Sequence, residues 1–218
     1  MSGRDTVLGR VRRALADVPK DESPAAVHVP RDYRRGNERP PHEVTDLFVD
    51  AVLDYGASVH RTTPGDLAPT VARICRARGI RTMAVAPGFP EQTVTAAGVV
   101  VLRDETPMSH ASLDRADAVA TSAALGIAET GTIVLVSGAG MGRRAISLVP
   151  DVHVCVIRED QLVETVPAAM EALATSATRP ITFISGGSAT SDIELVRVQG
   201  VHGPRVLEVV LLAADGGS

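Results

Sequence analysis

The stretch Thr121–Gly142, TSAALGIAETGTIVLVSGAGMG, decides the fold. At its centre lies Ile133–Val136, a continuous apolar run between turn residues, which is the pattern of a short strand buried on both faces. The polar run Glu129–Thr132 precedes this strand and the glycine-rich run Ser137–Gly142 follows it. Ligands of open α/β sheets bind outside the carboxyl ends of the strands, and glycine lets a ligand approach the backbone closely. The glycine-rich run is therefore a candidate site, with a tight surface turn as the alternative.

A second stretch near the carboxyl end has the same form. The apolar run Ile181–Ile184 is followed by Ser185–Glu194, SGGSATSDIE, and Gly200–Pro204 precedes a last strand, Val206–Leu212. Two strands that each end in Ser-Gly and small residues predict neighbouring loops at one edge of a sheet. We therefore expect the loops to share a single pocket.

Strands alternate with helices along the rest of the chain. Helical periodicity covers 43–55, 66–78, 143–148 and 167–175, and apolar runs of strand length cover 57–60, 82–86, 99–102 and 152–157. This alternation predicts an α/β protein with a largely parallel sheet flanked by helices.

The N-terminal residues differ in character from the rest. Residues 2–16 form an amphipathic helical pattern with an apolar stripe at Val7, Leu8, Val11 and Leu15, and a proline-rich segment follows up to Pro41. We expect an N-terminal arm over 1–41 and one α/β domain over 42–218. The helix should pack against a partner or a second copy of the chain, and the sequence leaves the oligomeric state open.

Composition excludes several classes of protein. A net charge of −4, a pI near 5.9 and an aromatic content of 2% argue against binding to nucleic acid or to an anionic membrane surface. The chain has no signal segment and no apolar run approaching about 18 residues. We therefore expect a cytoplasmic protein without membrane insertion.

The few cysteines and the single lysine argue against several kinds of active site. The two cysteines, Cys75 and Cys155, are too few and too far apart in sequence for an iron–sulfur cluster of the usual kind. Cys75 fits an apolar helical stripe, which favours a buried structural thiol. His153 and Cys155 alternate on one face of a strand but lack a third and fourth ligand, so no metal site is expected. Lys20, the only lysine, lies in the arm, where a Schiff-base role is disfavoured.

Glu129 is the candidate catalytic residue. A carboxylate among small residues just before a buried strand suits a general base or a covalent nucleophile. The alternatives are a surface glutamate and a carboxylate that binds the backbone of a neighbouring loop.

The glycine-rich loop is a candidate anion site rather than a nucleotide site. Arg143 stands where a dinucleotide fingerprint requires glycine, and no GK[ST] of a P-loop is present. Backbone N–H groups at a glycine turn, with Arg143 and Arg144 just beyond, favour a carboxylate or phosphate. The alternative is that both arginines face solvent. The full set of residues expected to bind a ligand around Glu129 is Thr130, Thr132, Ser137, Gly138, Gly140, Gly142, Arg143, Gly186, Gly187, Ser188, Asp192, Glu194 and His202.

Two segments carry a family resemblance. IAETGTIVLVSGAGMGRRAISLVPDVHVCVI (127–157) and ISGGSATSDIELVRVQGVHGP (184–204) resemble the LUD-domain family, and the similarity extends over about 118–212. The resemblance implies the fold shared by sugar-phosphate isomerases and CoA transferases, the NagB/RpiA/CoA-transferase-like fold. It also implies a role in oxidising L-lactate to pyruvate together with two iron–sulfur partner proteins. Gly187 is a departure, because relatives commonly have proline there.

The resemblance leaves two hypotheses open. In the first, the chain is a non-catalytic or assisting subunit of a lactate-oxidising system, with no cofactor of its own and iron–sulfur clusters in its partner proteins. In the second, it is an enzyme that uses Glu129 on an acyl, CoA or phosphorylated small molecule. The first is favoured because the sequence holds no redox ligand set, no nucleotide fingerprint and no usable lysine.

Overall fold

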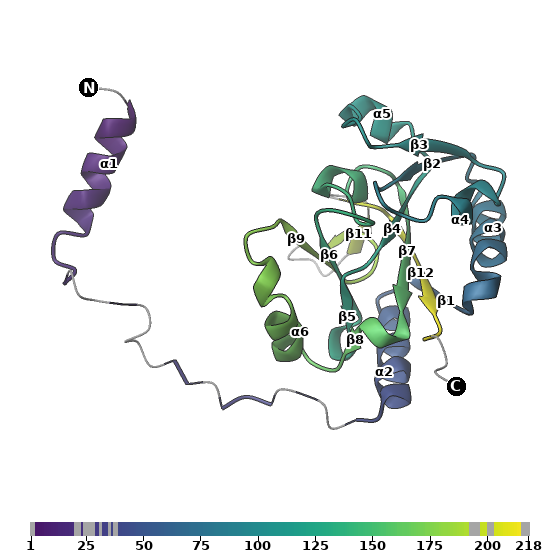
Figure 1. The fold of residues 1–218 in the computed structure, drawn as a ribbon, viewed down its shortest axis with the longest axis horizontal. Coiled ribbons are helices and arrows are strands. Elements are labelled where there is room, and N and C mark those ends of the chain that lie inside the picture. Colours follow the sequence, from purple (N-terminus) through teal and green to yellow (C-terminus); the bar gives the residue numbers. More distant parts are fainter. Residues whose placement is uncertain are drawn as a thin grey trace. The chain divides into compact units, whose positions relative to one another are not determined.

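The chain divides into two compact units, Met1–Tyr33 and Arg34–Ser218. A computed structural model describes residues 3–19, 23, 29–30, 32–34, 36, 39–191, 197–199 and 203–214. The first unit contains helix α1 (Gly3–Ala14), in which no residue is buried. The second unit is the α/β body (Figure 1).

The body is built on a six-stranded parallel sheet. Every neighbouring pair of strands in this sheet is parallel. From one edge to the other the strands are β1 (Ser58–Thr62), β12 (Val206–Leu212), β7 (Val152–Arg158), β4 (Ala118–Ser122), β2 (Thr82–Val85) and β3 (Val100–Arg103). The prediction of a largely parallel α/β sheet is therefore confirmed.

A smaller sheet lies against the large one. Its strands, in spatial order, are β8 (Leu162–Val163), β5 (Leu125–Ile127), β6 (Thr132–Val136) and β9 (Ile181–Ile184). Strand β6 is antiparallel to both β5 and β9. A separate hairpin pairs β10 (Ala189–Ser191) with β11 (Arg197–Gln199).

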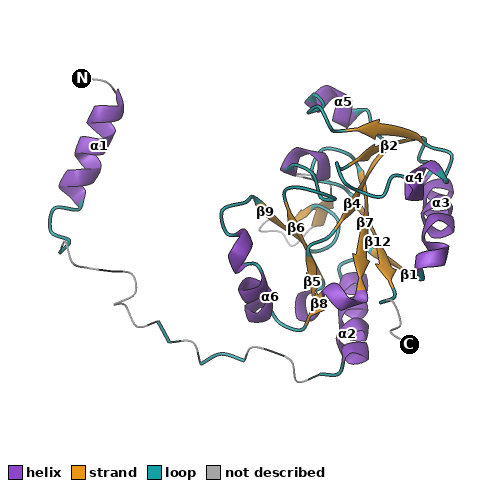
Figure 2. Ribbon diagram, viewed as in Figure 1, coloured by secondary structure: helices purple, strands orange, loops and turns teal. Residues whose placement is uncertain are grey.

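Helices cover both sheets, as Figure 2 shows. They are α2 (Pro41–Asp54), α3 (Leu67–Arg78), α4 (Gln92–Thr95), α5 (His110–Asp114) and α6 (Val166–Ala172). The predicted helix over 143–148 is a single 3₁₀ turn, Arg144–Ser147. Helix α3 ends at Gly79, whose φ of +66° suits glycine at a helix end. Among the described residues, no helix is long and apolar enough to span a bilayer.

The core consists of three clusters of buried side chains. Helix α3 packs Val71 and Ile74 onto one face of the large sheet, against residues such as Met83. Helix α2 and strand β6 cover the other face through side chains such as Phe48 and Ile133. Helix α6 closes the far side of the small sheet. The small sheet is therefore sandwiched between the large sheet and α6.

Three described residues ahead of α2 contact the body, and we call them the strap: Arg34, Gly36 and Arg39. Arg34 donates from Nη1 to Glu164 Oε1 at 2.8 Å, and Arg39 Nε lies 3.2 Å from the same oxygen. The Glu164 side chain is only 2% exposed. A Cβ on Gly36, whose φ is +91°, would lie 3.1 Å from Thr165 Cγ2. Contacts with the body thus begin before residue 41, where the sequence predicts the end of the arm. The domain boundary at residue 41 remains a prediction.

The strap predicts a cost for altering Glu164. Glu164→Gln keeps the shape but removes the charge that Arg34 and Arg39 bind, so the free energy of unfolding should fall by about 2–3 kcal/mol. Chemical denaturation measures this change. Glu105→Gln, at an exposed position, is the matched control and should change stability by less than about 0.5 kcal/mol. Equal values for the two variants would contradict the role of Glu164.

His153 is a buried polar residue in the middle of the large sheet. Its Nε2 lies 2.8 Å from Thr121 Oγ1, and among the described residues Nδ1 has no partner. Burial lowers the pKa of His153 to about 4 and raises the pKa of the neighbouring Cys155 thiol to about 12. Both groups are therefore neutral near pH 7. Thr121 also donates to Cys155 Sγ at 3.7 Å, so the three side chains form one internal polar cluster.

The depressed pKa of His153 predicts an acid-sensitive fold. Above about pH 6.5 the imidazole is neutral in both the folded and unfolded chain. Below this pH the unfolded chain binds a proton that the folded chain does not take up until about pH 4. Stability should therefore fall as the pH falls through this window, by about 3 kcal/mol from this group alone. The His153→Gln variant should lose this part of the pH dependence of the free energy of unfolding. Identical pH profiles for the variant and the wild type would refute the prediction.

Candidate functional site

The large sheet has a topological switch point between β2 and β4. From β2 the chain continues outward to the edge strand β3, whereas from β4 it continues to β7 on the other side. The connections that leave the two carboxyl ends therefore diverge and open a crevice. Ligands of open α/β sheets bind at such a crevice.

A cavity of about 590 Å³ lies at this switch point, and we call it the switch-point pocket. Its walls come from the segments that follow β2, β3 and β6, all at the carboxyl edge of the large sheet. The lining residues are Pro87, Gly88, Asp104, Ser137, Gly138, Ala139, Gly142 and Arg143. Its volume is in the usual range for small-molecule sites.

The glycine loop joins the pocket to the large sheet. Gly140 N–H donates to Pro87 O at 2.6 Å, and Gly140 O accepts from Ser122 N–H at 2.7 Å. Within the loop, Gly138 N–H donates to Gly142 O and Gly142 N–H donates back to Gly138 O. The glycine N–H groups expected to bind an anion are thus occupied by protein acceptors, which corrects that expectation. In the described residues of this loop, Ala139 has the N–H that remains for a ligand.

Arg143 is held rigidly at the pocket wall. Its Nε and Nη2 bind the two carboxylate oxygens of Asp104 at 2.8 and 3.0 Å, and Nη2 also donates to Met108 O at 2.6 Å. The hydrogen bonds that Arg143 donates to Asp104 raise the pKa of Arg143, so the guanidinium stays charged. The Asp104 side chain is 2% exposed. Arg143 is therefore a neutralised wall residue, whereas Arg144 is exposed.

Glu129 and the glycine loop lie at opposite ends of β6. Residues 129–132 lead into the strand and residues 137–142 leave it, and five residues at about 3.3 Å each place the ends roughly 16 Å apart. The Glu129 carboxylate pairs with Arg34 of the strap, and its side chain is 30% exposed. The expectation of one small pocket that holds both groups is therefore wrong.

The two Ser-Gly loops are separated for a related reason. Strands β6 and β9 are neighbours, but they are antiparallel, so Ile184 pairs with Ile133 and Ile181 pairs with Val136. Ser185 therefore lies beside the start of β6 and not beside Ser137. The prediction assumed carboxyl ends at a common edge, which only parallel strands have.

Some of the predicted residues do come together, at the Glu129 end of β6. Thr132 Oγ1 lies 2.7 Å from both Thr130 Oγ1 and Ser185 Oγ. A Cβ on Gly186 would lie 2.8 Å from Tyr55 O.

The loop continues toward the segment before β12. A Cβ on Gly187 would meet Arg205 O, and Ser188 N–H donates to Pro204 O at 2.7 Å. The loops 185–188 and 203–205 are thus side by side, as expected. Asp192, Glu194 and His202 lie outside the described residues.

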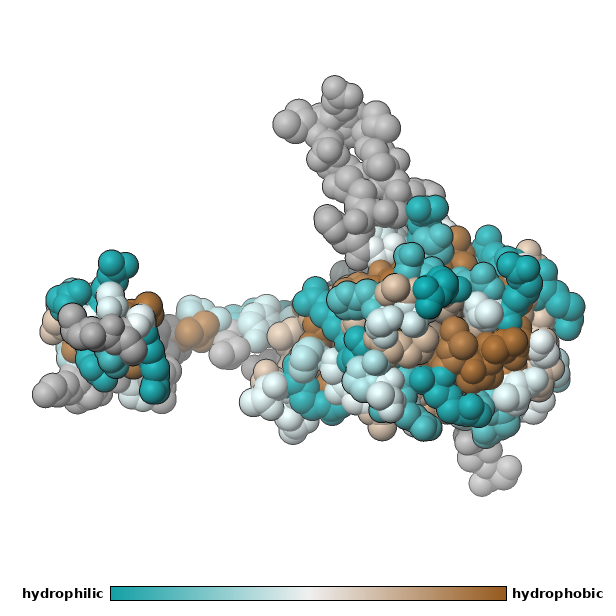
Figure 3. All heavy atoms as spheres, turned by 90° about the horizontal axis from the view of Figure 1, so that it is seen from above, coloured by the Kyte–Doolittle hydropathy of each residue, from teal (hydrophilic) through white to brown (hydrophobic). Residues whose placement is uncertain are grey.

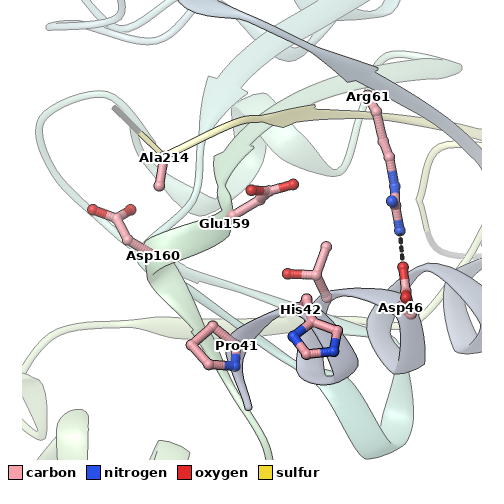
Figure 4. Close-up of a pocket in the computed structure, with 8 residues that line it drawn as sticks. Pro41, His42, Asp46, Arg61, Glu159, Asp160 and Ala214 are labelled. Atoms are coloured by element: carbon pink, nitrogen blue, oxygen red, sulfur yellow. Dashed lines mark hydrogen bonds and ion pairs between the residues drawn. The ribbon is translucent and has the colours of Figure 1, made fainter. Parts of the chain in front are cut away.

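A second cavity of about 600 Å³ lies at the same edge of the sheet, near β1 and β7 (Figure 4). It is lined by Pro41, His42, Thr45, Asp46, Arg61, Glu159, Asp160 and Ala214. Its charged groups are largely paired, Arg61 with Asp46 and Asp160 with Arg158. No sequence motif indicated it, because its residues come from separate segments. We therefore place the candidate site at the switch-point pocket.

These features define a class of protein: a parallel α/β sheet with a glycine-walled pocket at its switch point and a small mixed sheet packed on one face. A sequence model of the LUD domain matches residues 46–212. The chain belongs to the LUD-domain family.

Individual relatives agree with this assignment. The chain is 52% identical to lactate utilization protein C of Deinococcus radiodurans, over 94% of this chain and 93% of that protein. It is 28% identical to the uncharacterized protein YkgG of Escherichia coli K12, over 99% of this chain. The crystal structure of a DUF162 family protein from Deinococcus radiodurans superposes with a TM-score of 0.69 at 45% identity, covering 80% of this chain and 99% of that one.

The pocket geometry predicts different costs for two glycine substitutions. Gly88 and Gly98 have similar φ values, +83° and +73°, so alanine strains the backbone at both. Only at Gly88 would the new Cβ meet other groups, at 3.1 Å from Gly140 N and 3.2 Å from Ala139 Cβ. Gly98→Ala should lower the free energy of unfolding by about 1 kcal/mol, and Gly88→Ala by about 1–2 kcal/mol more. Equal losses in denaturant titrations would show that the loop does not pack on Gly88.

Proposed function

We propose that the chain acts in lactate utilization, as a component of an iron–sulfur-dependent system that oxidises L-lactate to pyruvate in the cytoplasm. The observation that carries the proposal is the 52% identity to lactate utilization protein C over nearly the full length of both proteins. The shared length includes the body that forms the switch-point pocket. In this proposal the chain has no redox centre, and its partners carry the iron–sulfur clusters.

The cysteine content supports the proposal that the iron–sulfur clusters belong to the partner proteins and not to this chain. The usual clusters take four cysteine ligands, and the whole chain has two cysteines. Both are buried free thiols, and Cys155 lies inside the sheet with its pKa raised to about 12. Burial keeps both side chains from bridging to a cluster held by another protein.

The switch-point pocket is the proposed working site of this component. It lies where the fold directs ligands, and its walls are fixed by the Arg143–Asp104 pair and the Gly140 hydrogen bonds. A preformed wall of this kind suits recognition of a small molecule without large rearrangement.

The alternative is an enzyme that uses Glu129 on an acyl, CoA or phosphorylated compound. Glu129 is ion-paired with Arg34 and lies at the far end of β6 from the switch-point pocket. A carboxylate neutralised by a guanidinium is a weaker base and nucleophile than a free one. The structure therefore favours the first function.

Genetic and biochemical tests separate the two functions. Deleting the coding sequence in the source organism should abolish growth on L-lactate, and both the wild-type chain and Glu129→Gln should restore it. The purified chain should be colourless, hold no stoichiometric iron, and support lactate oxidation only with cysteine-rich partner proteins. Growth without the chain, or iron–sulfur absorbance in the isolated protein, would refute the proposal. Failure of Glu129→Gln at unchanged melting temperature would favour the enzyme.

A further inference from the structure

Arg179, in the loop before β9, is fixed over the glycine loop. Its Nε donates to Ser137 O at 3.0 Å, and its Nη2 donates to the same oxygen. Two donors on one carbonyl oxygen orient the planar guanidinium. The side chain is nevertheless exposed to solvent.

Gly138 makes this position of Arg179 available. A Cβ on Gly138 would collide with Arg179 Nη2 and would lie 3.3 Å from Cζ. The φ of Gly138 is +146°, in a region that other residues rarely adopt. Because Gly138 lines the switch-point pocket, Arg179 lies next to the pocket wall, although it is not itself one of the lining residues.

The charge of Arg179 is not balanced by a neighbour. Among the described residues that line the pocket, Asp104 is the only carboxylate, and Arg143 already binds both of its oxygens. Within the described part of the chain, Arg179 forms no ion pair, and the acceptor of its hydrogen bonds is the neutral carbonyl of Ser137. Within the described residues, Arg179 therefore adds a positive charge without an acidic partner beside the pocket wall.

The free edge of the guanidinium has the geometry for an anion. Arginine has five N–H donors in a fixed plane. Nε and one hydrogen of Nη2 are directed at Ser137 O, so the edge formed by Nη1 and the other hydrogen of Nη2 remains. That edge matches the two oxygens of a carboxylate or phosphate.

We propose that Arg179 binds the anionic group, a carboxylate or a phosphate, of a small molecule held in the switch-point pocket. The inference rests on the proposed function in taking this pocket as the working site. Gly138 acts indirectly, by leaving room for the guanidinium.

Titration calorimetry on the full-length chain tests the proposal. Pyruvate, L-lactate and inorganic phosphate are the probes, each at constant ionic strength with chloride as the reference anion. At least one should bind saturably, and the one that does identifies carboxylate or phosphate as the recognised group. Arg179→Gln keeps a donor for Ser137 O but removes the charge, and should weaken binding about tenfold or more. Gly138→Ala should weaken binding as well, because it displaces Arg179.

Arg73→Gln is the matched control. Arg73 is an exposed arginine on α3, on the opposite face of the large sheet from the small sheet. This variant should bind the probe as the wild type does. The proposal is overturned if no probe binds the wild type, if Arg179→Gln binds normally, or if Arg73→Gln loses as much affinity. Melting temperatures confirm that each variant is folded.

Growth on L-lactate and anion binding are measured separately, so the proposed function and the role of Arg179 can fail independently. If the chain is needed on L-lactate but no anion binds, the function stands and the role of Arg179 fails. If anion binding depends on Arg179 but the chain is dispensable on L-lactate, the site stands and the proposed function fails.

Discussion

Two backbone hydrogen bonds at Gly140 hold the small sheet on the switch point of the large one. The N–H of Gly140 reaches Pro87 O, beyond the end of β2, and its carbonyl receives Ser122 N–H, at the end of β4. A Cβ here would lie 3.2 Å from Ser122 Oγ, and φ is +76°. A larger residue would push the loop away from both strands. The shape of the switch-point pocket therefore depends on this one close backbone approach.

Buried carboxylates paired with arginine fix the longer connections. Asp104, Glu164 and Glu208 each have side chains only 2% exposed, and each binds arginine from a distant part of the sequence. Glu208 on β12 accepts from Arg78 Nε at 2.5 Å and lies 2.6 Å from His60 Nε2. A buried charge without its partner costs several kcal/mol, so each pair defines where its loop must lie. Arginine suits this task because its planar fork engages a carboxylate at two points. On the face that Figure 3 shows, hydrophilic residues surround a patch in which apolar residues gather.

Local patterns predicted most of the secondary structure and less of the site. Helical periodicity identified α2 and α3, and apolar runs identified β6, β7, β9 and β12. Strand β4, AVATS, lies at the centre of the large sheet but was not predicted, because small and hydroxylated residues give no apolar run. Asp104 and Arg179 gave no signal either, since each becomes part of the site only through contact with the glycine loop.

The sequence by itself determined the α/β class, the glycine loop after β6 and the absence of a cysteine set for a cluster, because these follow from local periodicity and from residue counts. Only the tertiary structure decided that β9 runs antiparallel to β6, which places Ser185 and Ser137 at opposite ends of the small sheet. It also decided that Glu129 faces Arg34 and that Arg179 covers Gly138. Apolar burial is non-directional, so a hydrophobic pattern selects which face of a strand is buried but not the direction of its neighbour. That direction is set by connections and hydrogen bonds between residues far apart in the chain.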